Sequence, residues 1–187
     1  MKIRRLVGCV VALLPCLAFG AGGVPVPSAY AGQQARDVKS LSPEDVDGYL
    51  SGKGMGLAKA AELNGYAGPA HVLELASQLE LTAEQRALTE ALHAAMASKA
   101  AALGRALIAE ERRLDRLFAT RAVDAASLAA SLGEIGSLQA RVRGAHLEAH
   151  LAQVEILTPR QNARYARVRG YGGADVPPAG HDRGHRH

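Results

Sequence analysis

Two histidines, His146 and His150 in the stretch HLEAH, lie one helical turn apart and could act together as metal ligands. Side chains at positions i and i+4 of an α-helix share a face, so both imidazoles point to the same side. Neutral imidazoles suit zinc, nickel, cobalt and copper, and ligands from another helix would complete the coordination shell. The alternative is that the two rings hydrogen-bond across a helix interface and bind nothing. Because this spacing is frequent in helices, it leaves both interpretations open.

The stretch HLEAH differs from the zinc-protease motif, in which a glutamate directly follows the first histidine. Leu147 stands at that position, and Glu148 comes one residue too late to serve as the general base. The rest of the sequence offers no catalytic constellation. We therefore expect a binding protein and not an enzyme.

The apolar residues around the two histidines predict a long helix that begins near residues 123–124. At about 100° per residue, His146 and His150 fall within its apolar stripe, and we expect them to be buried. A second long helix is expected over residues 83–119, and a short link between two long helices produces an antiparallel hairpin. The stripe residues are Leu88, Leu92, Met96, Leu103, Leu107, Leu114, Leu117 and Phe118 in the first helix, and Leu128, Leu132, Ile135, Leu138, Val142, Leu147, Leu151, Val154 and Leu157 in the second.

The equal rise of the two helices predicts which residues face each other across the hairpin. With the turn centred near residue 122, His146 and His150 come to lie at the height of His93. A preceding helix that folds back near residues 79–81 brings His71 to the same level. We therefore predict that four histidines share one level and bind a divalent ion: His71, His93, His146 and His150. Glu90 and Met96 are candidates for additional ligands at that height.

Two copies of an LTxxQ pattern predict where helices begin. In a capping box, the threonine side chain accepts from the backbone N–H three residues on, and the glutamine there reaches back to the threonine N–H. One helix should therefore start at Thr82 and another at Thr158, where Pro159 fits the first helical position. Ser42 and Pro69 indicate the starts of two shorter helices. The residues of the two capping motifs are Leu81, Thr82, Gln85, Leu157, Thr158 and Gln161.

Residues 1–31 have the features of a cleaved signal peptide. A basic start, an apolar stretch too short to span a bilayer comfortably and the small-x-small sequence AYA place cleavage after Ala31, with a cut near Gly20 as the alternative. Both cysteines leave with this segment, so the mature chain has neither thiolate ligands nor disulfides. Removing its three basic residues lowers the net charge of +4 to +1. We expect a periplasmic protein with no stable membrane insertion after cleavage and no nucleic-acid partner.

The expected organisation is a signal peptide at 1–31, a polar lead with short helices at 32–68, the hairpin domain at 69–170, and a disordered histidine-rich tail at 171–187. Alanine and leucine dominate, which favours long helices in close contact. The fold class is accordingly all-α: a long antiparallel helical hairpin with short flanking helices. A modest apolar stripe on long helices needs a partner to cover it, so we also expect a homodimer.

The two LTxxQ motifs on an exported, helical chain resemble the Spy/CpxP family of periplasmic proteins. That family includes stress chaperones and the related zinc-resistance and CnrX-type heavy-metal sensors. The similarity covers about residues 73–171 and is strongest in LELTAEQ and AHLEAHLAQVEILTPRQNARY. The resemblance implies an all-helical, non-enzymatic domain that is often a dimer. In sensor members, a ligand pair similar to His146 and His150 and a ligand similar to His71 bind the metal, whereas chaperone members present a cradle to unfolded clients.

Three functions are compatible with the sequence. The first is a metal sensor or metal-responsive chaperone that binds zinc, nickel, cobalt or copper through the hairpin histidines. The second is a metal-independent chaperone that holds unfolded periplasmic proteins with exposed residues such as Leu151, Arg141 and Arg143. The third is a regulatory partner of an envelope sensor kinase or anti-sigma factor.

Overall fold

The computed structural model describes residues 27–171, and all regular structure in this part of the chain is helical. The chain divides into two compact units, residues 1–34 and 35–187. The described part of the first unit consists of turns and the start of a short 3-10 helix (Gln33–Ala35). The second unit contains α1 (Pro43–Ser51), α2 (Lys59–Glu62), α3 (Pro69–Glu74), α4 (Ala83–Ala119), α5 (Ala125–Ile156) and α6 (Pro159–Val168). The predicted all-α class is confirmed. Most of the predicted signal peptide, and the predicted tail beyond residue 171, lie outside the described residues.

Four of the helices begin where the sequence provides a side-chain cap. Thr82 accepts from the N–H of Gln85, whose side chain accepts from the Thr82 N–H, and Thr158 starts α6 with the same arrangement. Ser42 and Asp124 cap α1 and α5 in this way as well. Each cap satisfies N–H groups that have no partner within the helix. The helix starts predicted from the two LTxxQ motifs and from Ser42 are therefore confirmed.

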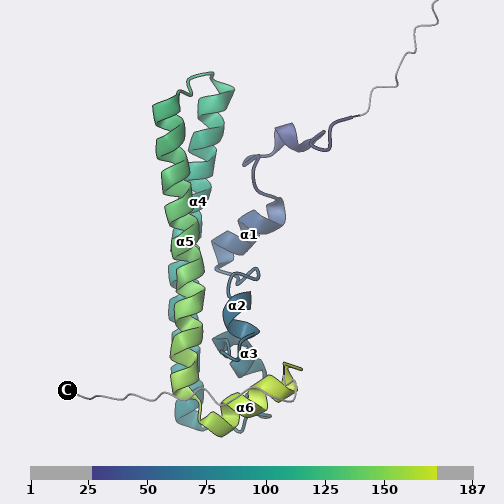
Figure 1. Cartoon of the computed structure of the whole chain (residues 1–187), viewed down its shortest axis with the longest axis vertical. Helices are drawn as coiled ribbons and strands as arrows, with labels where there is room; N and C mark the ends of the chain where they lie inside the picture. Colours follow the sequence, from purple (N-terminus) through teal and green to yellow (C-terminus); the bar gives the residue numbers. More distant parts are fainter. Residues whose placement is uncertain (1–26, 172–187) are drawn as a thin grey trace, which may run out of the picture. The chain divides into compact units, whose positions relative to one another are not determined.

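Helices α4 and α5 form the predicted antiparallel hairpin, joined by a turn at residues 120–124 (Figure 1). Facing residues agree with a turn centred near residue 122, since Arg113 donates to the Ser131 hydroxyl at 2.5 Å. Further from the turn, the Gln153 amide donates to the Thr89 hydroxyl at 3.2 Å. Burial of apolar surface between the two helices stabilises the pair. The central core consists of Ala100, Leu103, Leu107, Ile135, Leu138, Val142 and Ala145.

The short helices that precede α4 pack along one side of the hairpin (Figure 1). Helix α1 comes very close to α4 at Gly104, where a β-carbon would lie 2.4 Å from the Tyr49 carbonyl oxygen. The Tyr49 side chain packs against the central core. Helices α2 and α3 contact α5. These contacts place the segment from α2 to α3 beside the part of α5 that carries the two histidines.

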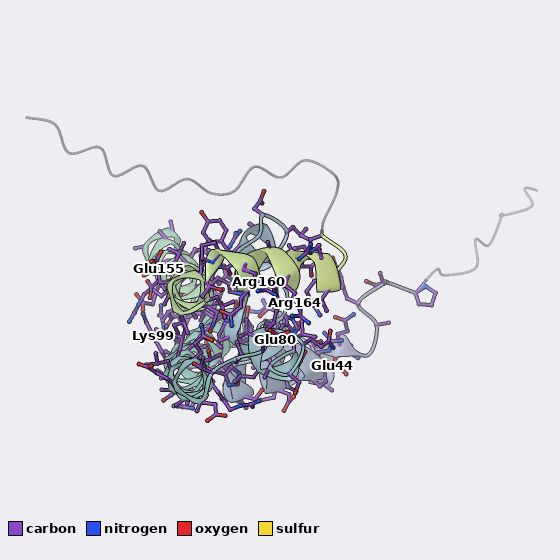
Figure 2. All side chains as sticks on the ribbon, turned by 90° about the horizontal axis from the view of Figure 1, so that it is seen from below. Glu44, Glu80, Lys99, Glu155, Arg160 and Arg164 are labelled. Carbon is purple, nitrogen blue, oxygen red and sulfur yellow. The ribbon has the colours of Figure 1, made fainter. Side chains whose placement is uncertain are left out.

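Helix α6 lies at the end of the hairpin opposite its turn (Figures 1 and 2). Its Tyr165 is fully buried and belongs to a second apolar cluster with Ala67, Val72, Leu79 and Leu157. On the surface, Arg164 of α6 pairs with Glu80 at 2.6 Å (Figure 2). Exposed ion pairs of this kind contribute little, so the buried cluster is the main attachment of α6.

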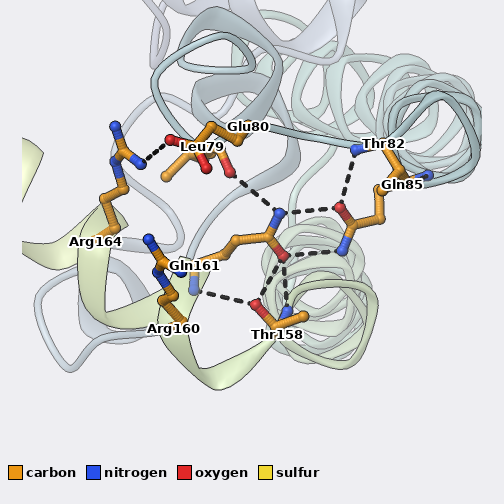
Figure 3. A pocket seen from close by; sticks show the side chains of 8 residues that line it. All are labelled: Leu79, Glu80, Thr82, Gln85, Thr158, Arg160, Gln161 and Arg164. Atoms are coloured by element: carbon orange, nitrogen blue, oxygen red, sulfur yellow. Dashed lines mark hydrogen bonds and ion pairs between the residues drawn. The ribbon is translucent and has the colours of Figure 1, made fainter.

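The glutamines of the two capping motifs join α4 to α6 (Figure 3). The Nε2 of Gln85 and that of Gln161 each donate to the other's Oε1 at 2.9 Å. Gln161 also donates to the Leu79 carbonyl at 3.1 Å, and Gln85 to the Ile156 carbonyl at 3.0 Å. Each glutamine therefore caps its own helix and also links three segments at the base of the hairpin.

Several residues of the predicted apolar stripes lie outside the core, and for them the prediction is wrong. Leu88, Phe118, Leu132 and Leu151 are 50–57% exposed. Besides Ile135, Leu138 and Val142, the buried face of α5 contains small and polar residues, among them Ser131, Ala149 and Gln153. Close packing against α4 and the short helices leaves little volume on that face, so small side chains occupy it.

Replacing Gln85 or Gln161 by alanine should lower the free energy of unfolding by about 1–2 kcal/mol, because each substitution removes a cap and the shared amide pair. The double variant should lose less than the sum, since the amide pair is removed only once. Urea denaturation followed by circular dichroism measures both effects. The matched control is Gln139→Ala at an exposed position in the middle of α5, which should cost less than about 0.5 kcal/mol. Strictly additive losses would contradict the coupling of the two motifs.

Candidate metal centre

His146 and His150 lie on the face of α5 that packs against the short helices, and both are buried as predicted. Only 4% of His146 and 9% of His150 is exposed. Ala145 and Ala149 share this face, and their small side chains allow other backbone segments to come near. The two imidazoles therefore lie at a junction of α5 with the segment from α2 to α3.

The backbone between α2 and α3 fixes the His150 ring. Its Nδ1 lies 2.8 Å from the carbonyl oxygen of Tyr66, which can only accept, so Nδ1 carries the proton and donates. In the neutral ring Nε2 then has the free lone pair, which is how a backbone carbonyl prepares a metal-binding imidazole. Gly68 lies against the same ring, since a β-carbon there would be 2.8 Å from Nε2. Glycine at position 68 thus keeps a side chain away from the nitrogen that could bind a metal.

His146 has a buried Nε2 with no hydrogen-bond partner. Burial, and to a lesser degree the nearby His150, lower the pKa of His146 below its usual value, so the ring is neutral at pH 7. The neutral form is the one that binds metal ions. Buried polar atoms without a partner are uncommon in folded proteins, which makes this nitrogen a candidate ligand atom.

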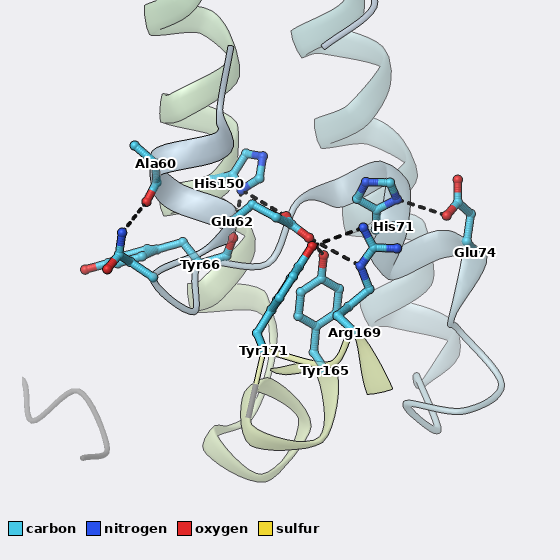
Figure 4. Close-up of polar contacts among 10 residues, drawn as sticks. Ala60, Glu62, Tyr66, His71, Glu74, His150, Tyr165, Arg169 and Tyr171 are labelled. Atoms are coloured by element: carbon cyan, nitrogen blue, oxygen red, sulfur yellow. Dashed lines mark hydrogen bonds and ion pairs between the residues drawn. The ribbon is translucent and has the colours of Figure 1, made fainter. Parts of the chain in front are cut away.

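Glu62, the last residue of α2, brings a carboxylate to the same junction (Figure 4). Its Oε1 accepts a 2.5 Å hydrogen bond from the Tyr165 hydroxyl and lies 3.4 Å from Nε of Arg169. Its Oε2 lies 3.8 Å from Nδ1 of His150 and is buried with no hydrogen-bond partner. Burial and the neighbouring carboxylate raise the pKa of Tyr165, so this hydroxyl remains a donor.

The other predicted ligands have more open surroundings. Nδ1 of His71 lies 2.9 Å from Oε2 of Glu74, and the His71 side chain is 39% exposed. On α4, His93 and Met96 are half-buried and Glu90 is exposed. Within residues 27–171, no hydrogen bond or ion pair joins any of these four predicted ligands to the α5 pair. Metal binding by them remains a prediction.

Two imidazoles and one carboxylate form a donor set that divalent transition metals accept. The structure brings His146 and His150 together on α5, and it adds Glu62 beside His150. It does not gather all four predicted histidines. Between residues 27 and 171, no three histidine, cysteine, aspartate or glutamate side chains are already arranged to hold a metal ion. Two atoms at the junction nevertheless suit a cation, since Nε2 of His146 and Oε2 of Glu62 are both buried and unpartnered.

Sequence reasoning missed Glu62 and its contact with Tyr165. Helix α2 spans four residues, which is too short for the apolar periodicity that located the long helices. A weak signal was available, because KAAELNG contains a single carboxylate in an alanine-rich stretch that ends at a glycine. The contact itself depends on how α6 folds back, and no local pattern encodes that.

The fold and the junction together define a helical-hairpin protein with a buried histidine pair. A family model described as heavy-metal resistance matches residues 54–164, which is more than half of the chain. The chain therefore belongs to the heavy-metal resistance family. This confirms the resemblance to the Spy/CpxP-like and CnrX-type proteins. No curated protein and no solved structure matches the chain. Within residues 27–171, no helix has both the length and the apolar character needed to cross a membrane.

Substituting Gly68 by alanine should displace the His150 ring, since the new β-carbon would lie 2.7 Å from Cε1 and 2.8 Å from Nε2. Overpacking of this kind costs about 1–3 kcal/mol of stability. If His150 is a ligand, zinc affinity should also fall by at least about tenfold, as it does when the support of a ligand is disturbed. Thermal denaturation and calorimetric zinc titration measure the two effects.

The matched control is Gly133→Ala on α5, where a β-carbon would meet nothing within 4 Å. That substitution should leave zinc binding unchanged and stabilise the helix by up to about 1 kcal/mol. A Gly68→Ala variant with the stability and zinc affinity of the parent would contradict the close contact with His150.

Proposed function

We propose that this protein is exported, acts without catalysis and binds a divalent heavy-metal ion at the histidine pair of α5. The proposal rests chiefly on the buried Nε2 of His146, which has no hydrogen-bond partner and belongs to a side chain one helical turn from His150. Membership of the heavy-metal resistance family supports the class of function. Zinc, nickel, cobalt and copper all accept imidazole nitrogen.

The energetics of the junction favour a cation there. A buried polar atom without a partner costs about 1–3 kcal/mol, and a bound ion would convert this cost into a metal–ligand bond. The hydrogen bond from His150 to Tyr66 already holds one ring in a suitable tautomer. Little further ordering is needed for this ligand, so less of the binding free energy is lost.

Glu62 is our candidate for the third ligand. Its Oε2 is buried without a hydrogen-bond partner and lies 3.8 Å from Nδ1 of His150, the ring nitrogen that donates to Tyr66. To share an ion with the imidazoles, the carboxylate would have to move toward Nε2 of His150. Its negative charge would also offset the charge of the ion, which neutral imidazoles do not do. His71, His93, Glu90 and Met96 are the remaining candidates to complete the shell.

We further propose that the ion controls a second activity, either signalling to an envelope regulator or holding unfolded proteins. An ion bound at this junction would connect α5 to α2, and through α2 to the short segments along the hairpin. A homodimer would cover part of the apolar surface that the hairpin leaves exposed.

A second candidate function is a metal-independent chaperone. The observation in its favour is the exposure of Leu88 and Leu151, at 50% and 57%, on the two arms of the hairpin. Arg141 and Arg143 are exposed on α5 as well. Apolar and basic surface of this kind can hold unfolded chains by weak contacts. Protection of a model client that is unchanged by chelator would favour this candidate.

The double variant His146→Ala/His150→Ala should lose at least about 100-fold in zinc affinity, because it removes both α5 ligands. Calorimetric titration of the mature chain with zinc, nickel, cobalt and copper, each after chelator treatment and dialysis, measures the loss. All proteins in the comparison should carry alanine at His181, His185 and His187, so that the tail does not bind metal.

The matched control is Gln139→Ala, which shortens an exposed side chain on the same helix. It should change zinc affinity by less than about tenfold if the α5 pair dominates. Circular dichroism verifies that each variant is folded. A folded double variant that binds all four metals as tightly as the parent would refute the proposed site.

A further inference from the structure

The turn end of the hairpin, opposite α6, exposes apolar side chains (Figure 1). Phe118, the only phenylalanine outside the predicted signal peptide, is 55% exposed at the end of α4. Leu117 and Val123, which lie close to it in the chain, are half-buried, and Leu132 on α5 is 53% exposed. We call residues 116–128 the hairpin tip. Apolar side chains that lie together on an exposed surface mark a site of interaction.

The unpaired charges of the hairpin tip are positive. Its charged residues are Arg116, Arg121 and Asp124. The Asp124 carboxylate accepts from the N–H and the hydroxyl of Ser127 and thereby caps α5. Among residues 27–171, the side chains of Arg116 and Arg121 form no hydrogen bond or ion pair, and both residues are exposed. Two free guanidinium groups beside exposed apolar side chains therefore favour an anionic partner.

Arg121 occupies a backbone position that favours glycine. Its φ is 56°, and its N–H donates to the Phe118 carbonyl, while the N–H of Ala122 donates to the Leu117 carbonyl. These two hydrogen bonds end α4, and glycine is the usual residue at the left-handed position between them. Arginine is less favourable than glycine there, so backbone stability does not explain it. The charge that it gives to the hairpin tip does.

We propose that the hairpin tip docks on the surface of a bilayer that contains anionic phospholipid. Phe118, Leu117 and Val123 enter the headgroup region, and Arg116 and Arg121 bind lipid phosphates. Apolar side chains next to basic ones are the combination that attaches peripheral proteins to anionic membranes. The apolar part of the tip is small, so the attachment is reversible and differs from insertion across the bilayer. The docking does not depend on the proposed metal site.

The shape of the hairpin tip favours a lipid surface over a folded protein. A short turn, residues 120–124, joins the ends of two antiparallel helices, so the tip is narrow and convex (Figure 1). A folded partner would need a cavity of matching shape, whereas the headgroup layer adapts to a convex surface. Guanidinium groups also bind phosphate oxygens with paired hydrogen bonds, which suits lipid headgroups.

Tryptophan fluorescence tests the docking, because the chain contains no tryptophan. Phe118→Trp places a single reporter in the hairpin tip, and Leu151→Trp places one elsewhere on the hairpin, where the native side chains are 55% and 57% exposed. Each mature chain is titrated with vesicles of phosphatidylcholine alone and with vesicles that also contain phosphatidylglycerol. The emission of Phe118→Trp should shift to the blue with the anionic vesicles only. That of Leu151→Trp should not shift with either kind.

Vesicle flotation of chains without tryptophan measures what each group contributes. Removing one arginine of the tip should lower the partition coefficient about fivefold, and Phe118→Ser/Arg121→Ser should lower it at least about tenfold. The matched control is Leu151→Ser/Arg141→Ser, which removes an exposed leucine and an exposed arginine from α5. The control should bind as the parent does. High salt should weaken the binding of the parent, because it screens the arginines.

Arg121→Gly separates docking from folding stability. Glycine adopts the positive φ of this position without strain, so the midpoint of thermal unfolding should not fall. Binding to anionic vesicles should nevertheless fall about fivefold, because one cation is lost. A purely structural role of Arg121 would not weaken vesicle binding in a chain that is at least as stable as the parent.

Three results would overturn the proposal. The first is an emission of Phe118→Trp that neither kind of vesicle shifts; if poly-L-glutamate shifts it instead, the tip binds an acidic protein and not a membrane. The second is an equal shift with both kinds of vesicle, because the charge of the lipid would then not be recognised. The third is equal flotation of the parent and Phe118→Ser/Arg121→Ser, which would assign the binding to another surface.

Discussion

The structure depends on how a carboxylate and two imidazoles are kept out of water at one junction. Buried charge is tolerated only where it finds partners, and Glu62 finds them in Tyr165 and Arg169. His150 finds its partner in the backbone of Tyr66. Nε2 of His146 and the second oxygen of Glu62 have no hydrogen-bond partner. These two atoms distinguish the junction from an ordinary polar contact between helices, and they account for the metal site that we propose.

The hairpin contributes the two imidazoles of the junction, and the short helices contribute its carboxylate. Helix α5 presents both histidines at a fixed spacing and is held along its length by α4. The carboxylate comes from α2, which is short and flanked by glycines in left-handed conformations. In the proposed site, the ligand pair would be rigid and the third ligand less constrained, which would let the site exist with and without its ion. At the base of the hairpin, Gln85 and Gln161 join α4 to α6. They thereby fix the helices that surround the junction.

The sequence predicts the long helices and their starts better than it predicts the contacts of Glu62. Capping boxes at Thr82 and Thr158 located two helix starts correctly, because a cap is a local interaction between residues three apart. Helical periodicity correctly placed His146 and His150 inside. The same periodicity wrongly placed Leu132 inside, since burial on a two-sided helix is decided by which neighbours pack there and not by hydrophobicity alone. The contacts of Glu62 could not be predicted, for a related reason. Its partners His150 and Tyr165 lie 88 and 103 residues further along the chain, and such contacts are set by tertiary packing.

X-ray absorption spectroscopy of the mature chain loaded with one equivalent of zinc or cobalt identifies the atoms that surround the bound ion. The tail histidines should be replaced, so that the signal comes from the folded domain. We expect a first shell of nitrogen and oxygen in which outer-shell scattering shows two imidazoles, and we expect that imidazole signal to be lost in His146→Ala/His150→Ala. A spectrum of an ion surrounded by water and carboxylate oxygen, identical in the parent and the double variant, would contradict it.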